Sequence, residues 1–185
     1  ASKVFKLPIN QVTKELRNKA KTANFGIIYG ISAFKLSQRM NIPRKEANDL
    51  ITEYFKTFPG IKKYMSEMIL FAKENGYVET ILKRRRYLPD IHSQNAVVRG
   101  MAERNAINSP IQGSAADIIK LAMIRICEEF YVRQLKSKMI LQVHDELIFD
   151  VFPDELDIVK TIVKEKMENA YKMSVPLKVD IGTGE

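Results

Sequence analysis

Two short runs of β-forming residues, 139–143 and 147–151, flank the polar tripeptide His144-Asp145-Glu146. Runs of this length around a tight polar turn predict an antiparallel hairpin. Most of the remaining chain has apolar residues at helical spacing, with a second short hairpin or loop at 77–90 and a last alternating strand at 176–181. The sequence therefore predicts an α+β fold, with a mostly helical region before a small antiparallel sheet.

Glycine and proline positions predict where the helices begin and end. Residues 10–40 are expected to be helical, with Asn10 as a cap and Gly30 as a stop or bend. Two further helices are expected after Pro43, the second closed by Gly76. Pro110 is expected to end a helix over 94–108, and further helices are expected over 114–135 and 153–171.

The composition excludes several classes of protein. A single cysteine, Cys127, excludes a disulfide scaffold and a cysteine-rich zinc module, and it suits a reducing compartment. Two histidines, His92 and His144, are too few for a histidine-rich metal site. The apolar runs are far shorter than the roughly 18 residues that a membrane span needs, and no secretion signal is seen at the start of the sequence.

The net charge of +8 is unevenly distributed along the 185 residues. Residues 1–105 contain 20 basic and 9 acidic side chains, whereas residues 106–185 contain 10 basic and 13 acidic ones. A basic part beside an acidic part favours an anionic partner held near a carboxylate site, and nucleic acid is the obvious candidate. A solvated basic surface that maintains solubility explains the charge equally well.

Arg17, Lys21, Phe25 and Tyr29 recur at four-residue steps, with Gly30 directly after them. On a helix these side chains form one slanted stripe, with two cations followed by two aromatic rings. Such a stripe suits a nucleoside triphosphate, whose phosphates the cations would neutralise. By spacing alone, an ordinary amphipathic helix with a basic edge explains the same pattern.

The turn His144-Asp145-Glu146 would hold carboxylates at a fixed point between two strands. Carboxylate oxygens suit Mg²⁺, which commonly takes one or two of them together with substrate phosphates. Neighbouring residues of an extended chain point to opposite sides, so one of the two carboxylates is expected to face a given site. The alternative is a simple polar turn.

Two further polar clusters lie in the middle of the chain. Arg104, Asn108 and Gln112 also step by four and would donate to acceptors in a nucleic-acid minor groove, although Pro110 interrupts the last step. The basic run 84–86 would contact phosphate through one or two of its arginines. The alternative for the first cluster is helix capping with ordinary surface polarity. The alternative for the basic run is a solvated turn.

Several of these motifs resemble those of family A DNA polymerases, the bacterial DNA polymerase I type. The stripe is similar to the family's fingers-helix motif, and Val143-His144-Asp145-Glu146 is similar to its palm motif. Three more stretches match in the expected order, at residues 76–80, 84–89 and 108–113. The resemblance therefore extends over nearly the whole chain.

The resemblance implies a role for each of these residues. Arg17 and Lys21 would grip the triphosphate, with Lys21 also protonating the leaving pyrophosphate, while Phe25 would pack on the sugar and Tyr29 at the nascent base pair. Asp145 would bind a catalytic metal in a two-Mg²⁺ site, with Glu146 accessory. The implied primer–template contacts are Gly30, Arg85, Arg104, Asn108, Gln112 and His144.

The resemblance also implies that this sequence is part of a larger enzyme. Residues 1–92 would form the fingers region with its basic hairpin, and residues 93–185 the C-terminal part of the palm. The family's earlier palm motif, with a second metal-binding aspartate, precedes the fingers motif, but residues 1–16 contain no aspartate. We therefore expect the thumb and first palm strand to be partners, the isolated fragment to be inactive, and the parent enzyme to act in DNA replication or repair in the bacterial cytoplasm.

Two other functions remain open at this point. A single-subunit RNA polymerase would share the Arg-Lys-Tyr-Gly pattern, but that family usually has serine where Glu146 stands. A non-catalytic nucleic-acid-binding module would also explain the basic segment.

Overall fold

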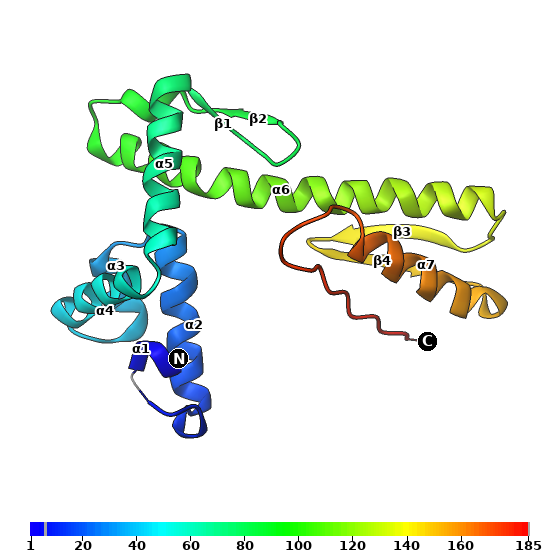
Figure 1. The fold of residues 1–185 in the computed structure, drawn as a ribbon, viewed down its shortest axis with the longest axis horizontal. Coiled ribbons are helices and arrows are strands. Elements are labelled where there is room, and N and C mark those ends of the chain that lie inside the picture. The colour runs from blue at the N-terminus through cyan, green and yellow to red at the C-terminus, as the bar shows by residue number, and fades with distance from the viewer. Residues whose placement is uncertain (6, 185) are drawn as a thin grey trace. The chain divides into compact units, whose positions relative to one another are not determined.

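The computed structural model describes residues 1–5 and 7–184. The chain divides into two compact units: unit 1 comprises Ala1–Glu79 and Arg85–Pro110, and unit 2 comprises Thr80–Arg84 and Ile111–Glu185. Helices dominate, and the strands form two separate antiparallel hairpins, as shown in Figure 1. The predicted α+β class, with a helical region and a small hairpin sheet, is confirmed.

Unit 1 begins with four helices packed around one apolar cluster. They are α1 (Ser2–Phe5), α2 (Lys14–Ile28), α3 (Ala33–Met40) and α4 (Arg44–Thr57), with a 3₁₀ turn at Ile9–Gln11. Burial of apolar side chains is the main force that holds them together. The buried residues of this cluster are Ala23, Ile27, Leu36, Met40, Ala47 and Tyr54.

The start of α2 differs from the prediction. Asn10 lies in the 3₁₀ turn, and Thr13 caps the helix instead, because its Oγ1 accepts the Leu16 N–H at 3.2 Å. The expected break is confirmed, since α2 ends at Ile28 and Gly30 adopts a φ of +72°, a left-handed conformation that favours glycine.

The rest of unit 1 connects a long helix to the first hairpin. Helix α5 (Pro59–Asn75) ends at Gly76, whose φ of +76° forms the predicted left-handed cap. Strands β1 (Tyr77–Glu79) and β2 (Arg85–Tyr87) pair antiparallel, which confirms the predicted short hairpin, and a 3₁₀ turn follows at Pro89–His92. A second apolar cluster joins these elements to the start of α6: Ala72, Val78, Leu88, Ile91, Ala102 and Ala106.

Helix α6 (Ala96–Val132) runs through Pro110 without a break, so the prediction of two helices separated there is wrong. Proline removes the hydrogen bond that its N–H would have donated one turn back. Side chains donate to carbonyls near this point: Tyr64 Oη to the Ile107 oxygen at 3.1 Å, and Ser109 Oγ to the Asn105 oxygen at 2.6 Å. Burial of this segment and these extra bonds keep the helix continuous.

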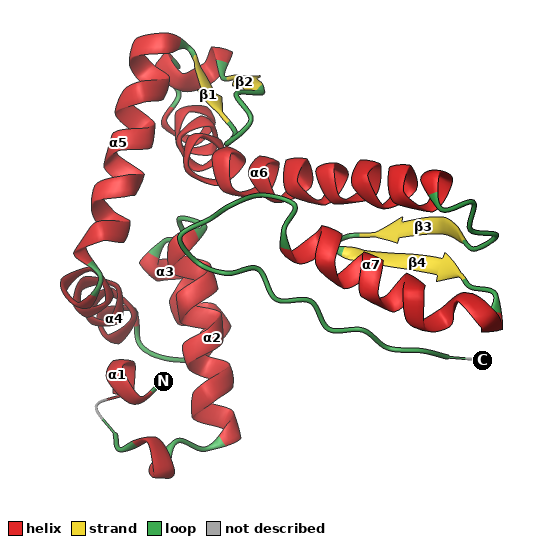
Figure 2. Cartoon of the chain, turned by 45° about the vertical axis from the view of Figure 1, so that its right-hand side comes forward, coloured by secondary structure: helices red, strands yellow, loops and turns green. Residues whose placement is uncertain are grey.

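In unit 2, α6 and α7 (Leu156–Glu168) cover one face of the hairpin formed by β3 (Lys138–Val143) and β4 (Glu146–Asp150), as Figure 2 shows. The buried residues are Ile126, Phe130, Val159, Ile162 and Val163, with Met139, Leu147 and Phe149 packed against them. A register shift between Met139 and Leu141 interrupts the pairing. The predicted hairpin and following helix are therefore confirmed.

Residues 176–181 form no strand, so that prediction is wrong. The segment alternates as expected, with Leu177 and Val179 half-buried between exposed neighbours. However, its backbone hydrogen-bonds to a side chain, since Val179 N–H donates to Glu168 Oε1. A strand needs the backbone of a second strand, and no described residue supplies one.

Candidate functional site

The candidate stripe lies on the exposed side of α2. Ala20, Ala23, Gly26 and Ile27 form the buried side of this helix, and the helical period places the predicted stripe away from it. Arg17, Lys21, Phe25 and Tyr29 are all exposed, the last as the C-terminal cap.

The stripe is continuous at its aromatic end. Lys21 Nζ lies 6.0 Å from the centroid of the Phe25 ring, and the rings of Phe25 and Tyr29 stack with centroids 6.4 Å apart and planes 13° apart. Phe25 remains 47% exposed and Tyr29 42%. Exposed aromatic faces next to a free ammonium group can pack against a sugar or base while the cation meets a phosphate.

Gly30 and Arg104, which were predicted separately, lie together within unit 1. A Cβ atom on Gly30 would stand 3.0 Å from Arg104 Cγ, and the glycine φ of +72° disfavours any side chain. The turn that ends α2 therefore lies directly against Arg104 on α6. Arg104 is the first residue of a polar row that continues with Asn108 and Gln112.

The polar row of Arg104, Asn108 and Gln112 lies on one continuous helix, α6. Arg104 and Gln112 are exposed, whereas Asn108 is half-buried, and its Oδ1 atom has no hydrogen-bond partner among the described residues. Because the helix continues through Pro110, the four-residue spacing of the row is kept. A buried amide oxygen without a partner is unusual in a folded protein, so Oδ1 of Asn108 is an unused hydrogen-bond acceptor within the described residues.

The arginines of the basic run 84–86 have different surroundings. Arg85 pairs with Glu79 at 3.1 Å and lies 4.3 Å from the Tyr77 ring centroid. Hydrogen bonding to Glu79 is the main cause that raises the pKa of Arg85, with smaller contributions from the two tyrosines of the hairpin. Arg86 is exposed and forms no ion pair with any described residue, so its guanidinium is the most available of the three.

Sequence reasoning missed the partner of Arg84. Its guanidinium binds the buried carboxylate of Asp117 on α6, with Nε and Nη2 at 2.9 and 2.8 Å from the same oxygen. An aspartate within the apolar run of residues 115–119 was the available signal, because a buried carboxylate requires a cationic or hydrogen-bonding partner.

The hairpin turn presents the predicted metal-binding group. His144 has a φ of +55°, and the side chain of Gln142 donates to its carbonyl oxygen at 2.9 Å, which fixes the turn. His144, Asp145 and Glu146 are all exposed. Across residues 1–5 and 7–184, no group of three or more potential ligands forms a metal site. One exposed carboxylate of this turn would be among the one or two that a Mg²⁺ site takes together with substrate phosphates.

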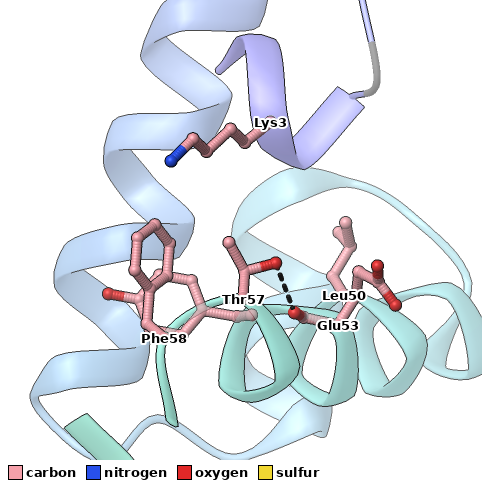
Figure 3. Close-up of a pocket in the computed structure, with 6 residues that line it drawn as sticks. Lys3, Leu50, Glu53, Thr57 and Phe58 are labelled. Carbon is pink, nitrogen blue, oxygen red and sulfur yellow. Dashed lines mark hydrogen bonds between the residues drawn. The ribbon is translucent and has the colours of Figure 1, made fainter. Parts of the chain in front are cut away.

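Most of the candidate residues lie exposed on the surface. A cavity drawn in Figure 3 lies elsewhere in unit 1, between α1, α4 and Phe58, and Lys3 Nζ lies 5.7 Å from the centroid of the Phe58 ring. Its volume of about 10 Å³ is at the lower limit for one water molecule and excludes a nucleotide. In the part of the chain described, no helix is both long and apolar enough to cross a membrane.

Comparison with known proteins gives consistent matches over the whole chain. The model of "DNA polymerase family A" matches residues 1–185. DNA polymerase I of Caldicellulosiruptor bescii is 51% identical over the full chain, and that of Bacillus subtilis is 49% identical. The chain spans 22% and 21% of the lengths of these relatives.

A solved structure is similar in both sequence and fold. It is the POL domain of Pol1 from M. smegmatis in complex with DNA primer-template and dNTP. The TM-score is 0.91 and the identity 45%, over 96% of this chain and 31% of that one.

Proposed function

Because this chain belongs to DNA polymerase family A, we propose that it is the fingers and C-terminal palm part of a DNA polymerase. The parent enzyme would add deoxynucleotides to a primer 3′-hydroxyl as directed by a template, in DNA replication or repair. We assign residues 1–92 to the fingers and residues 93–185 to the palm. Family membership, together with Glu146, favours DNA polymerase over the single-subunit RNA polymerase.

The exposed cation–aromatic stripe of α2 is the observation that carries the nucleotide-binding part of this proposal. Arg17 and Lys21 would neutralise the triphosphate, while Phe25 and Tyr29 would offer their exposed faces to the sugar and base. In the reaction, the primer 3′-oxygen bonds to the α-phosphorus as the bond to pyrophosphate breaks. The hydroxyl proton would pass to solvent water, and Lys21 would donate a proton to the leaving pyrophosphate.

Asp145 would hold Mg²⁺ at the tip of the β3–β4 hairpin, with Glu146 accessory. When bound, the metal supplies Lewis-acid activation of the 3′-hydroxyl and stabilises charge on the phosphate oxygens. The fixed turn supports this assignment, because a metal ligand must be held at a constant position.

Gly30, Arg85, Arg104, Asn108, Gln112 and His144 would contact the primer–template. Three properties support five of these residues: the left-handed turn at Gly30 beside Arg104, the unpartnered oxygen of Asn108, and the exposure of Gln112 and His144. The similar POL domain structure contains both primer-template and dNTP, which is consistent with these two ligands here.

The hairpin also supports the rest of a polymerase chain as a partner. The face of β3–β4 away from α6 and α7 leaves apolar side chains exposed, among them Leu141 and Ile148, which pair across the strands. A two-stranded sheet with an uncovered apolar face is marginal alone. Since the curated relatives are bacterial, we place the parent enzyme in the bacterial cytoplasm, where the chromosome lies.

Substitution of Asp145 in the full-length polymerase that carries this sequence tests the proposal. Asp145→Asn should lower primer extension by at least about 10³-fold and leave primer–template affinity nearly unchanged, since one metal ligand is lost without a change in volume. Asp150→Asn is the matched control, because Asp150 is also exposed and lies at the far end of β4, the strand that begins directly after Asp145. Extension that persists in Asp145→Asn would refute the metal assignment.

A further inference from the structure

Asp117 is a buried carboxylate with one ionic partner. The residue is 6% exposed, Arg84 Nε donates to its Oδ1 at 2.9 Å, and Arg84 Nη2 lies 2.8 Å from the same oxygen in an ion pair. The other oxygen, Oδ2, is buried with no hydrogen-bond partner among the described residues. Arg84 is therefore the group that makes burial of this charge tolerable, and its loss would leave the whole carboxylate unpaired.

The turn that carries Arg84 is tightly folded. Thr80 N–H donates to the Arg84 carbonyl at 3.0 Å, and Arg84 N–H donates to Thr80 Oγ1 at 3.2 Å. Lys83 closes the turn with a φ of +65° and a hydrogen bond from its N–H to the Thr80 carbonyl. The guanidinium thus extends from a backbone that is itself fixed.

This turn contacts α6 within one stretch of unit 2 (Figure 1). Besides the ion pair with Asp117, Ile81 N–H donates to Ser114 Oγ at 2.8 Å, and Arg84 Nη2 donates to the Gly113 carbonyl at 3.2 Å. The contacted residues belong to the helical turn that directly follows Gln112. The network therefore acts on the backbone that sets the direction of the Gln112 side chain.

That part of the helix needs outside support. Pro110 has no N–H, so the α-helical ladder lacks one bond just before Gln112. Gln112 itself is exposed, and no hydrogen bond within the described residues orients its amide. The contacts from the 80–84 turn therefore add to the Tyr64 and Ser109 bonds and support the part of α6 that follows Gln112.

We propose that Asp117 and Arg84 are positioning residues of the DNA site, which hold the turn of α6 that presents Gln112 to the primer–template. The proposal rests on the proposed function, because it requires that Gln112 contacts DNA. In this proposal neither residue binds DNA. The ion pair fixes the backbone of α6, and that backbone sets the direction of the Gln112 side-chain amide.

Coupling to Gln112 distinguishes positioning from a general effect on folding. Primer–template dissociation constants would be measured by fluorescence anisotropy for the full-length wild type, Asp117→Asn, Gln112→Ala and the double variant. Asp117→Asn should weaken binding about tenfold when Gln112 is present and add little when it is alanine. Arg84→Lys, which keeps the charge but loses the two-donor fork, should give an intermediate loss. Glu129→Gln, which removes the ion pairs of this α6 residue with Arg133 and Lys166, is the control and should not change affinity.

The outcomes separate the two proposals. A wild type that does not bind primer–template refutes the proposed function, and it also refutes the positioning role of Asp117 and Arg84. If Gln112→Ala weakens binding but Asp117→Asn does not, or if Asp117→Asn weakens it equally in both backgrounds, only the positioning role is refuted. It is also refuted if Gln112→Ala has no effect in an enzyme that binds and extends primers.

Discussion

Gly113 of α6 faces Thr80 of the 80–84 turn, so a single methyl group there has a calculable effect on stability. A Cβ on Gly113 would stand 2.6 Å from Thr80 Cγ2, nearer than real Cβ atoms come to other atoms. The threonine cannot easily rotate away, because its Oγ1 accepts the Arg84 N–H. We therefore predict that Gly113→Ala forces the turn away from the helix.

Helix propensity and overpacking have opposite effects on the free energy of unfolding of Gly113→Ala. Alanine in a helix interior is favoured over glycine by about 1 kcal/mol, whereas overpacking costs about 1–3 kcal/mol. Gly113→Ala should thus change the free energy of unfolding by between zero and about −2 kcal/mol. Thr80→Ser removes Cγ2 but keeps the hydroxyl, so the same alanine should then stabilise by about 1 kcal/mol. The coupling between the two changes is expected to be about 1–3 kcal/mol.

Urea denaturation followed by circular dichroism measures these differences. Gly100→Ala is the matched control: it lies in the same helix, and its new Cβ would meet Arg104 Nη1 at an ordinary 3.5 Å. It should stabilise by about 1 kcal/mol whichever residue occupies position 80. The reasoning is refuted if Gly113→Ala stabilises as much as Gly100→Ala with Thr80 present, or if Thr80→Ser fails to restore the gain.

Three other predictions follow from separate contacts. Tyr54→Phe removes the 2.7 Å hydrogen bond to Asn24 Oδ1 and should cost about 1 kcal/mol by the same denaturation assay; an unchanged midpoint would contradict it. The pKa of Glu155 is lowered, mainly by the backbone N–H of Lys136 and then by Ser137, so its stabilisation is present above the ordinary pKa of 4.5 and is lost as the pH falls. Glu155→Gln should therefore lower stability at pH 7 and flatten its decline in acid, whereas an unchanged pH profile would exclude this role. The affinity of the chain for primer–template DNA should fall at least about tenfold between 50 and 200 mM salt, and a salt-independent affinity would argue against phosphate contacts by the basic segment.

Local patterns explain why much of the fold could be predicted. The hairpins, the αL cap at Gly76 and the exposed stripe on α2 depend on residues within a few positions of one another, and the periodicity reports them directly. The prediction at Pro110 is wrong because packing and side-chain donors outweighed the local preference for a break. The strand expected at 176–181 is absent because a strand depends on a partner, which alternation alone does not supply.

The sequence by itself determined the types of side chain that the candidate site offers, their spacing and the uneven charge, since these are properties of neighbouring residues. Only the tertiary structure decided which distant residues meet. It placed Gly30 against Arg104 and joined Arg84 to Asp117, 33 positions apart. Such pairs form where a buried carboxylate needs a cationic partner, or where a side chain packs against a glycine that has no Cβ, and sequence spacing does not encode either requirement.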